Sequence, residues 1–135
     1  MIVDLEDKTE TGWFDLRAGG RVQLRLLSIT DVRAIRDASV KTVVEYPLLD
    51  GVYKRFESEK FNAELATEIR HDRTIMGWEK LFDKNEKEIP VTRANKKLLM
   101  ELVPEFREAV DNGLKALKEA DEAKSGQAEK NSLMS

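Results

Sequence analysis

The chain has 135 residues, of which 41% are hydrophobic and 36% charged, and its formal net charge is −3. A chain of this length corresponds to one domain, which can bury a sizeable core without metal or disulfide staples. The absence of cysteine excludes disulfides, thiolate metal sites and thiol nucleophiles, and is typical of a reducing cytoplasm.

The first twelve residues are acidic and carry no periodic pattern, so we expect residues 1–12 to form a flexible arm. They contain no apolar run that could act as a signal peptide. No stretch elsewhere approaches the length of a membrane helix. The sequence therefore predicts a cytoplasmic protein with no membrane partner.

A β-hairpin is predicted where apolar and polar residues begin to alternate, from Trp13 onward. Phe14 and Leu16 precede a turn at Gly19-Gly20, and an alternating run from Arg21 to Leu26 follows it. An isolated hairpin is unstable in water, so its apolar face is expected to pack on helices.

A short helix should follow, because Ser28-Ile29-Thr30-Asp31 has the Ser-x-x-acid pattern of a capping box. We expect this helix to end near Ser39. Beyond it, Val43 to Tyr46 favours a strand, and Asp50-Gly51 marks a turn before a second apolar run, Val52 to Phe56. The pattern predicts a second hairpin that pairs with the first.

Asn62 is a candidate cap for a long helix with Phe61, Leu65, Ile69 and Met76 on its inner face. We expect its last turns to carry Met76, Trp78, Leu81 and Phe82. Asp72 and Arg73 interrupt the apolar stripe.

A polar turn over residues 83–88 separates this helix from the next. Pro90 bars helix at the residue before it, and Thr92 can cap a new helix. Leu98, Leu99, Leu102 and Val103 are spaced as one buried helix face, which Pro104 ends.

The last helix is predicted from Phe106, Val110, Leu114 and Leu117, which recur at four, four and three residues. Residues 124–135 are polar and unpatterned and are expected to be disordered. Together these elements predict one α+β domain over residues 13–123, in which N-terminal β-hairpins pack on a mainly α-helical C-terminal half.

No pattern indicates catalysis, a metal or a cofactor. His71 and Asp72 are neighbours on a predicted helix and point in different directions, so a solvent-facing histidine is the better interpretation. Asp83-x-Asn85-x-Lys87 resembles the start of a calcium loop but has lysine at its fifth position, and Glu88 replaces the required glycine at its sixth.

Nucleic acid is disfavoured as a partner, although five arginines form a candidate basic patch: Arg17, Arg21, Arg25, Arg33 and Arg36. The domain is acidic overall, and nucleic-acid-binding domains of this size are usually basic. Trp78 has two interpretations, a core residue or an anchor for a protein partner.

The stretch from Ile69 to about Leu117 resembles the phage tail assembly chaperone family. The resemblance lies in Gly77-Trp78-x-x-Leu81-x-Asp83, a polar turn, Ile89-Pro90-x-Thr92, and Asn95-x-x-Leu98-Leu99 followed by a proline. The glycine of the family's Asp-x-x-Gly turn is missing, with Glu86 or Lys87 in its place, and Asn85 is expected to supply the left-handed conformation.

The resemblance implies a non-enzymatic protein that keeps the helical tape-measure protein soluble during tail assembly in the bacterial cytoplasm. The tail tube protein and a second copy of the chain are further candidate partners. Candidate partner-binding residues are Trp78, Leu99, Leu102, Phe106, Val110 and Leu114. The alternative for the last five is that they close the domain's own core.

Two other classes remain open: a structural tail or head-completion protein retained in the virion, and a small RNA-binding regulator that uses the arginines. The resemblance also implies a longer product made by a −1 ribosomal frameshift. Glu129-Lys130-Asn131 is encoded by a slippery heptamer if its codons are GAA-AAA-AAC.

Overall fold

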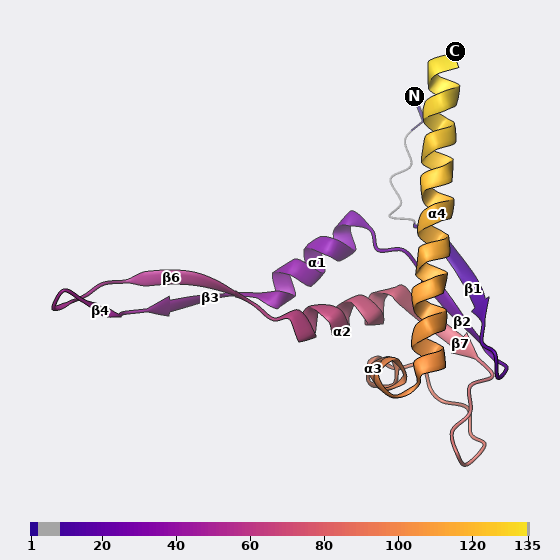
Figure 1. Ribbon diagram of the computed structural model, residues 1–135, viewed down its shortest axis with the longest axis horizontal. Coiled ribbons are helices and arrows are strands. Elements are labelled where there is room, and N and C mark those ends of the chain that lie inside the picture. Colours follow the sequence, from indigo (N-terminus) through magenta and orange to yellow (C-terminus); the bar gives the residue numbers. More distant parts are fainter. Residues whose placement is uncertain (3–8, 135) are drawn as a thin grey trace.

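The computed structural model describes residues 1–2 and 9–134, with side chains as far as Lys124. The elements run β1 (Thr11–Asp15), β2 (Arg21–Arg25), α1 (Ile29–Ser39), β3 (Val40–Glu45), β4 (Leu48–Leu49), β5 (Val52–Tyr53), β6 (Phe56–Phe61), α2 (Ala63–Thr74), β7 (Ile75–Glu79), α3 (Arg93–Leu102) and α4 (Pro104–Met134). The fold is α+β, as predicted. Figure 1 shows a sheet crossed by the long helix α4, with α1 and α2 leading from it to a narrow ribbon.

The central sheet is antiparallel, in the order β1-β2-β7. The predicted hairpin is confirmed, with Phe14 opposite Val22, and the chain turns at Gly19-Gly20, where both glycines have positive φ. Val22 and Leu24 are fully buried in a core formed with α4. The apolar face of the hairpin therefore packs on a helix, as its instability in isolation requires.

Close packing of α4 on this sheet depends on Gly113. A Cβ atom at this position would lie 2.7 Å from Leu24 Cδ1 and 2.8 Å from Phe14 Cδ2. Val110 and Phe106 are fully buried on the same side of the helix, about one and two turns before Gly113. The helix and sheet can approach closely because this position has no side chain.

The prediction that Met76 to Phe82 form the last turns of a helix is wrong. α2 ends at Thr74, and Ile75–Glu79 form strand β7, which pairs with β2. A register shift opposite Gln23 and Leu24 leaves Met76 as an extra residue, so Ile75 and Trp78 are both buried although they are three positions apart. A bulged strand thus has the same apolar spacing as one face of a helix.

The second hairpin is confirmed, but its predicted pairing with the first is wrong. β3 pairs with β6 and β4 with β5, in sheets separate from the central one. Phe61 ends β6 and is exposed, so it does not begin the inner face of α2. Val40 continues directly from α1, which carries the hairpin away from the central sheet (Figure 1).

The predicted helix caps are confirmed. The Ser28 hydroxyl accepts from Asp31 N and the Asp31 carboxylate accepts from Ser28 N, which completes a capping box. Asn62 and Thr92 each accept a backbone N–H three residues ahead, at the starts of α2 and α3.

The interruption in the stripe of α2 is explained by two long-range polar contacts. Arg73 donates to Asp31 of α1, and Asp72 accepts from Lys96 of α3 through both its carboxylate and its backbone carbonyl. Lys96 is only 9% exposed, and it satisfies a carbonyl near the end of α2 that has no partner within the helix. These two positions tie α2 to both neighbouring helices.

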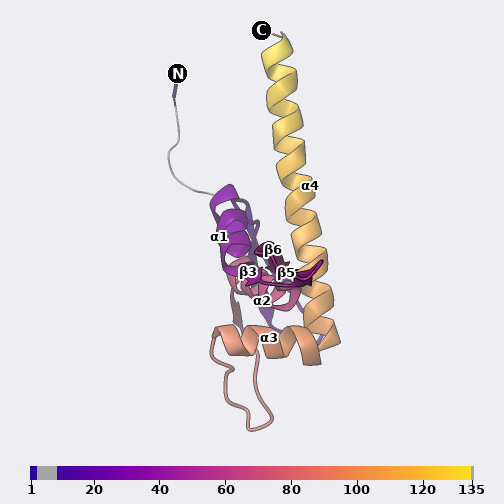
Figure 2. The ribbon, with the colours of Figure 1, turned by 90° about the vertical axis from the view of Figure 1, so that its left-hand side faces the viewer.

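α3 lies across the N-terminal end of α4, and the loop of residues 80–92 extends below α3 in the view of Figure 2. Asp83 Oδ1 accepts from the backbone N–H groups of Asn85 and Lys87. The left-handed residue of this turn is Glu86, with φ 60°, and not Asn85 as predicted. The carboxylate of Asp83 is thereby used in turn formation.

The ends of the chain extend past the predicted domain. β1 begins at Thr11, so the predicted flexible arm of residues 1–12 overlaps a strand, and its residues 3–8 lie outside the described residues. The backbone of α4 continues to Met134, through most of the predicted disordered tail 124–135. Side chains beyond Lys124, including those of Glu129-Lys130-Asn131, also lie outside the described residues.

Candidate partner-binding groove

An apolar groove follows the outward side of α3. Its first part is a cavity of about 290 Å³ lined by Asp83, Ile89, Pro90, Asn95, Leu98, Leu99, Leu102 and Val103. An adjoining cavity of about 150 Å³ shares Leu99 and Val103 with it and is also lined by Leu16, Ala18, Gly19, Leu81, Glu105 and Phe106. We call these two cavities together the α3 groove.

The groove exists because α3 carries more apolar residues than the core can cover. Leu99 and Met100 are buried against the rest of the domain. Leu98 is 48% and Leu102 71% exposed, so the predicted buried face of Leu98, Leu99, Leu102 and Val103 is wrong for all but Leu99. Leu98 and Leu102 are one helical turn apart and form an exposed apolar ridge.

The wall of the groove is fixed by Trp78. Its indole Nε1 donates to Ile89 O at 2.8 Å, and its ring meets Phe106 edge to face at a centroid distance of 5.9 Å. Asn95 Nδ2 donates to Pro90 O on the same loop. Trp78 is 5% exposed, so it supports the groove from within the core and does not offer a surface for direct contact.

The structure brings some of the predicted partner-binding residues together and separates others. Leu99, Leu102 and Phe106 line the α3 groove. Val110 is fully buried where α4 packs on the central sheet, and Leu114 is partly buried against the same core. Leu98 and Val103 also line the groove, although their spacing predicted a buried face. Ile89 and Pro90 were not predicted to bind a partner, because loop–helix contacts leave no periodic signal in the sequence.

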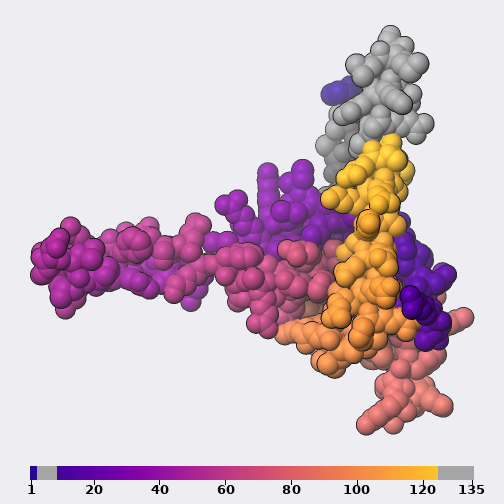
Figure 3. All heavy atoms as spheres, in the orientation of Figure 1, coloured from indigo at the N-terminus to yellow at the C-terminus, as the bar shows by residue number. Residues whose placement is uncertain are grey.

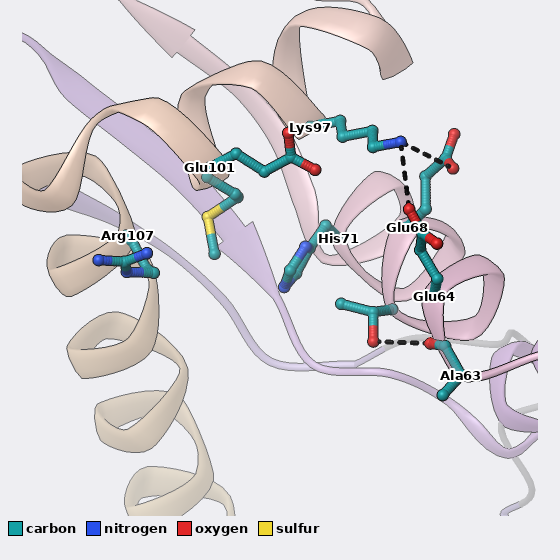
Figure 4. Close-up of a pocket in the computed structure, with 9 residues that line it drawn as sticks. Ala63, Glu64, Glu68, His71, Lys97, Glu101 and Arg107 are labelled. Carbon is teal, nitrogen blue, oxygen red and sulfur yellow. Dashed lines mark hydrogen bonds and ion pairs between the residues drawn. The ribbon is translucent and has the colours of Figure 1, made fainter.

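A second, more polar cavity of about 480 Å³ lies between α2, α3 and α4 (Figure 4). It is lined by Ala63, Glu64, Thr67, Glu68, His71, Lys97, Met100, Glu101 and Arg107. His71 is half-buried in the wall of this cavity. The prediction of a solvent-facing histidine is therefore wrong. Burial, followed by the charge of Arg70, lowers the pKa of His71 against a smaller opposing effect from Asp111.

Ion pairs engage part of the charged side chains in and beside this cavity. Asp72, the neighbour of His71, is bound to Lys96, and Lys97 lies between Glu64 and Glu68 at 4.0 and 3.9 Å. Within the described part of the chain, no three His, Asp or Glu side chains are placed to hold a metal ion. Lys97 thus pairs with two carboxylates of the cavity, one of which, Glu68, also pairs with Arg93.

The candidate basic patch is largely neutralised by carboxylates. Three of its five arginines make ion pairs: Arg17 with Glu108, Arg21 with Glu79 and Arg25 with Asp31. Arg21 also lies over the ring of Trp13, 4.1 Å from its centroid. A phosphate backbone would have to compete with these partners for the arginines.

Over the described ranges, no helix combines the length and apolar character needed to cross a membrane. Comparisons of the chain with protein-family models, with curated proteins and with solved structures found no match.

Proposed function

We propose that the chain is a non-enzymatic tail assembly chaperone that holds helical segments of a tape-measure protein in the α3 groove. The observation that carries the proposal is the exposed apolar ridge of α3, within the stretch whose residues resemble that family. A helix whose apolar residues recur every three or four positions can lay that stripe into such a groove. Masking the stripe would prevent its aggregation before the tail tube encloses it.

Two further observations support this proposal. Glu86 has a positive φ at the position where the family's Asp-x-x-Gly turn carries glycine. Trp78, the tryptophan of the shared pattern, donates a hydrogen bond to the backbone carbonyl of Ile89. This bond holds in place the loop that forms one wall of the groove. In this proposal the resembling residues form the binding surface for the partner helix.

The proposal predicts a long helical reading frame beside this gene, and the test is co-expression of the chain with the product of that reading frame. Leu102→Asp places a charge on the groove without disturbing the core, because the side chain is 71% exposed. We expect an unchanged melting temperature and loss of the partner from the soluble fraction. Val32→Asp is the matched control, since Val32 is 55% exposed on α1, and it should leave both unchanged.

A Leu102→Asp variant that still keeps the partner soluble would exclude the groove as the binding surface.

An alternative, a structural tail or head-completion protein, is favoured by one observation, the ribbon of β3 and β6 with its unpaired strand edges. Mass spectrometry of purified particles separates the two, because a chaperone is absent from the virion. The proposed frameshift has its own test. A silent change of the Lys130 codon from AAA to AAG would disrupt the slippery heptamer and should reduce the amount of the longer product.

A further inference from the structure

The ribbon formed by residues 40–61, here called the arm, stands clear of the rest of the domain (Figures 1 and 3). Its large apolar side chains are mostly exposed: Val44, Tyr46, Leu48, Leu49, Val52, Tyr53, Phe56 and Phe61. A two-stranded ribbon is marginally stable in water on its own. Because β3 and β6 form a two-stranded sheet, each also has one edge beside which no other described strand lies.

Among the described residues, the charged side chains of β3 have no oppositely charged partner. Lys41 lies directly opposite Lys60 of β6, and Glu45 lies opposite Phe56. Neither Lys41 nor Glu45 forms an ion pair with another described residue. Like charges directly opposite each other destabilise a strand pair, so an anion beside Lys41 would stabilise the arm.

We propose that two copies of the chain associate through the free edges of β3, antiparallel, about a two-fold axis at Val43. Identical antiparallel strands related by a two-fold axis must pair one residue with its own copy. With Val43 at that position, Lys41 lies opposite Glu45 of the second copy, and Glu45 opposite the second copy's Lys41. Thr42 lies opposite Val44 in the same way.

This register gives both charged residues of β3 an oppositely charged neighbour. Centring the pair on Thr42 or Val44 instead places Lys41 or Glu45 opposite uncharged residues, and centring it on Lys41 opposes two lysines. On β6, an axis at Glu57, Ser58, Glu59 or Lys60 always sets like charges against each other. Charge complementarity therefore selects the β3 edge and the register at Val43.

The result would be a four-stranded antiparallel sheet with β3 of each copy at its centre and β6 at its edges. Three or more strands are what an isolated sheet needs for stability, so pairing compensates for the distance between the arm and the core. The Lys41–Lys60 repulsion would be offset by Glu45 of the second copy on the same face. This association does not depend on the proposed chaperone function.

Charge reversal tests the register, with the dimer dissociation constant measured by sedimentation equilibrium on the full chain. Lys41→Glu and Glu45→Lys each replace two attractive pairs with two repulsive ones, and we expect each to weaken the dimer roughly tenfold or more. The double variant Lys41→Glu/Glu45→Lys restores opposite charges and should recover the dimer. Lys54→Glu, on the same arm but outside β3, is the control and should have little effect.

Cysteine cross-linking tests the edge, since the chain has no cysteine of its own. Paired residues at a two-fold axis lie about 4.5–5.5 Å apart between Cα atoms, within reach of a disulfide. Val43→Cys should therefore give a covalent dimer on mild oxidation. Ser58→Cys, on the neighbouring strand opposite Val43, should not, because its two copies would lie three strand spacings apart.

A chain that stays monomeric at hundreds of micromolar overturns the proposal, as does cross-linking through Ser58→Cys in place of Val43→Cys. A dimer that survives both single charge reversals would place the interface elsewhere. Leu102→Asp leaves the arm unchanged and should dimerise normally, so failure of the proposed chaperone function and failure of this association are told apart.

Discussion

Arg73 and Asp31 are joined across 42 positions of sequence by a 2.7 Å hydrogen bond from Arg73 Nη1 to Asp31 Oδ1. Arg25 donates to the same carboxylate at 2.6 and 2.9 Å, and Ser28 N donates at 2.8 Å. Asp31 is 4% exposed. One carboxylate thus caps α1 and ties it to β2 and α2, which makes it the junction between the central sheet and the helices that carry the arm.

Replacing Asp31 with asparagine should destabilise the domain by roughly 2–4 kcal/mol. This is toward the lower part of the range for a broken buried ion pair, because the guanidinium groups of Arg25 and Arg73 both reach solvent. Urea denaturation at neutral pH measures this change. Glu68→Gln, which removes a more exposed ion pair with Arg93, is the control and should cost less than about 1 kcal/mol. Equal losses in the two variants would contradict the junction role.

The same carboxylate should make the stability of the domain fall at acid pH. Hydrogen bonds from Arg25 above all, then from Ser28 and Arg73, hold the pKa of Asp31 well below its usual 3.8, against the effect of burial. A depressed folded-state pKa stabilises the domain fully above 3.8 and progressively less as the pH falls below it. Between about pH 4 and about pH 2, the wild type should lose more stability than Asp31→Asn, as followed by urea denaturation.

Gly113→Ala should destabilise the domain by roughly 1–3 kcal/mol, although alanine is the better helix former. The reason is the new methyl group, which would overlap Leu24 and Phe14. Ala116→Gly on the exposed side of α4 is the comparison and should cost only the helix propensity, about 1 kcal/mol. A Gly113→Ala variant with a higher melting temperature would show that α4 can shift away from the sheet.

Ser39→Ala should be neutral or should stabilise the domain by up to about 1 kcal/mol. Its hydroxyl is buried at the end of α1 and has no hydrogen-bond partner in the part of the chain that the structure describes. Thr74→Val is the matched variant, because the Thr74 hydroxyl donates to Arg70 O at 2.9 Å, and it should be destabilising. Thermal melts of both variants check the difference in sign.

Trp78→Ala should destabilise the domain by roughly 3–5 kcal/mol, as truncation of a large buried aromatic does. Trp78→Phe keeps most of the packing on Phe106 but loses the donor to Ile89 O, and should cost about 1 kcal/mol. A normal melt for Trp78→Ala would contradict its place in the core.

The sequence by itself determined the features that depend on neighbours along the chain. Ser28, Asn62 and Thr92 begin the three helices they were predicted to cap, and Gly19-Gly20 turns the first hairpin. Pro104 separates α3 from α4. Each of these signals arises from a backbone conformation or a hydrogen bond within about four residues, so no distant contact was needed to recognise it.

Only the tertiary structure decided where the apolar faces point. Ile75 and Trp78 have the spacing of a helix face, but pairing with β2 and a bulge at Met76 place them on one side of a strand. Leu98 and Leu102 continue a helical stripe with Leu99 and yet remain outside, because the core is already filled from the other side of α3 by Leu99 and Met100. Spacing along a chain fixes which side chains share a face, whereas the contacts of that face depend on elements distant in sequence.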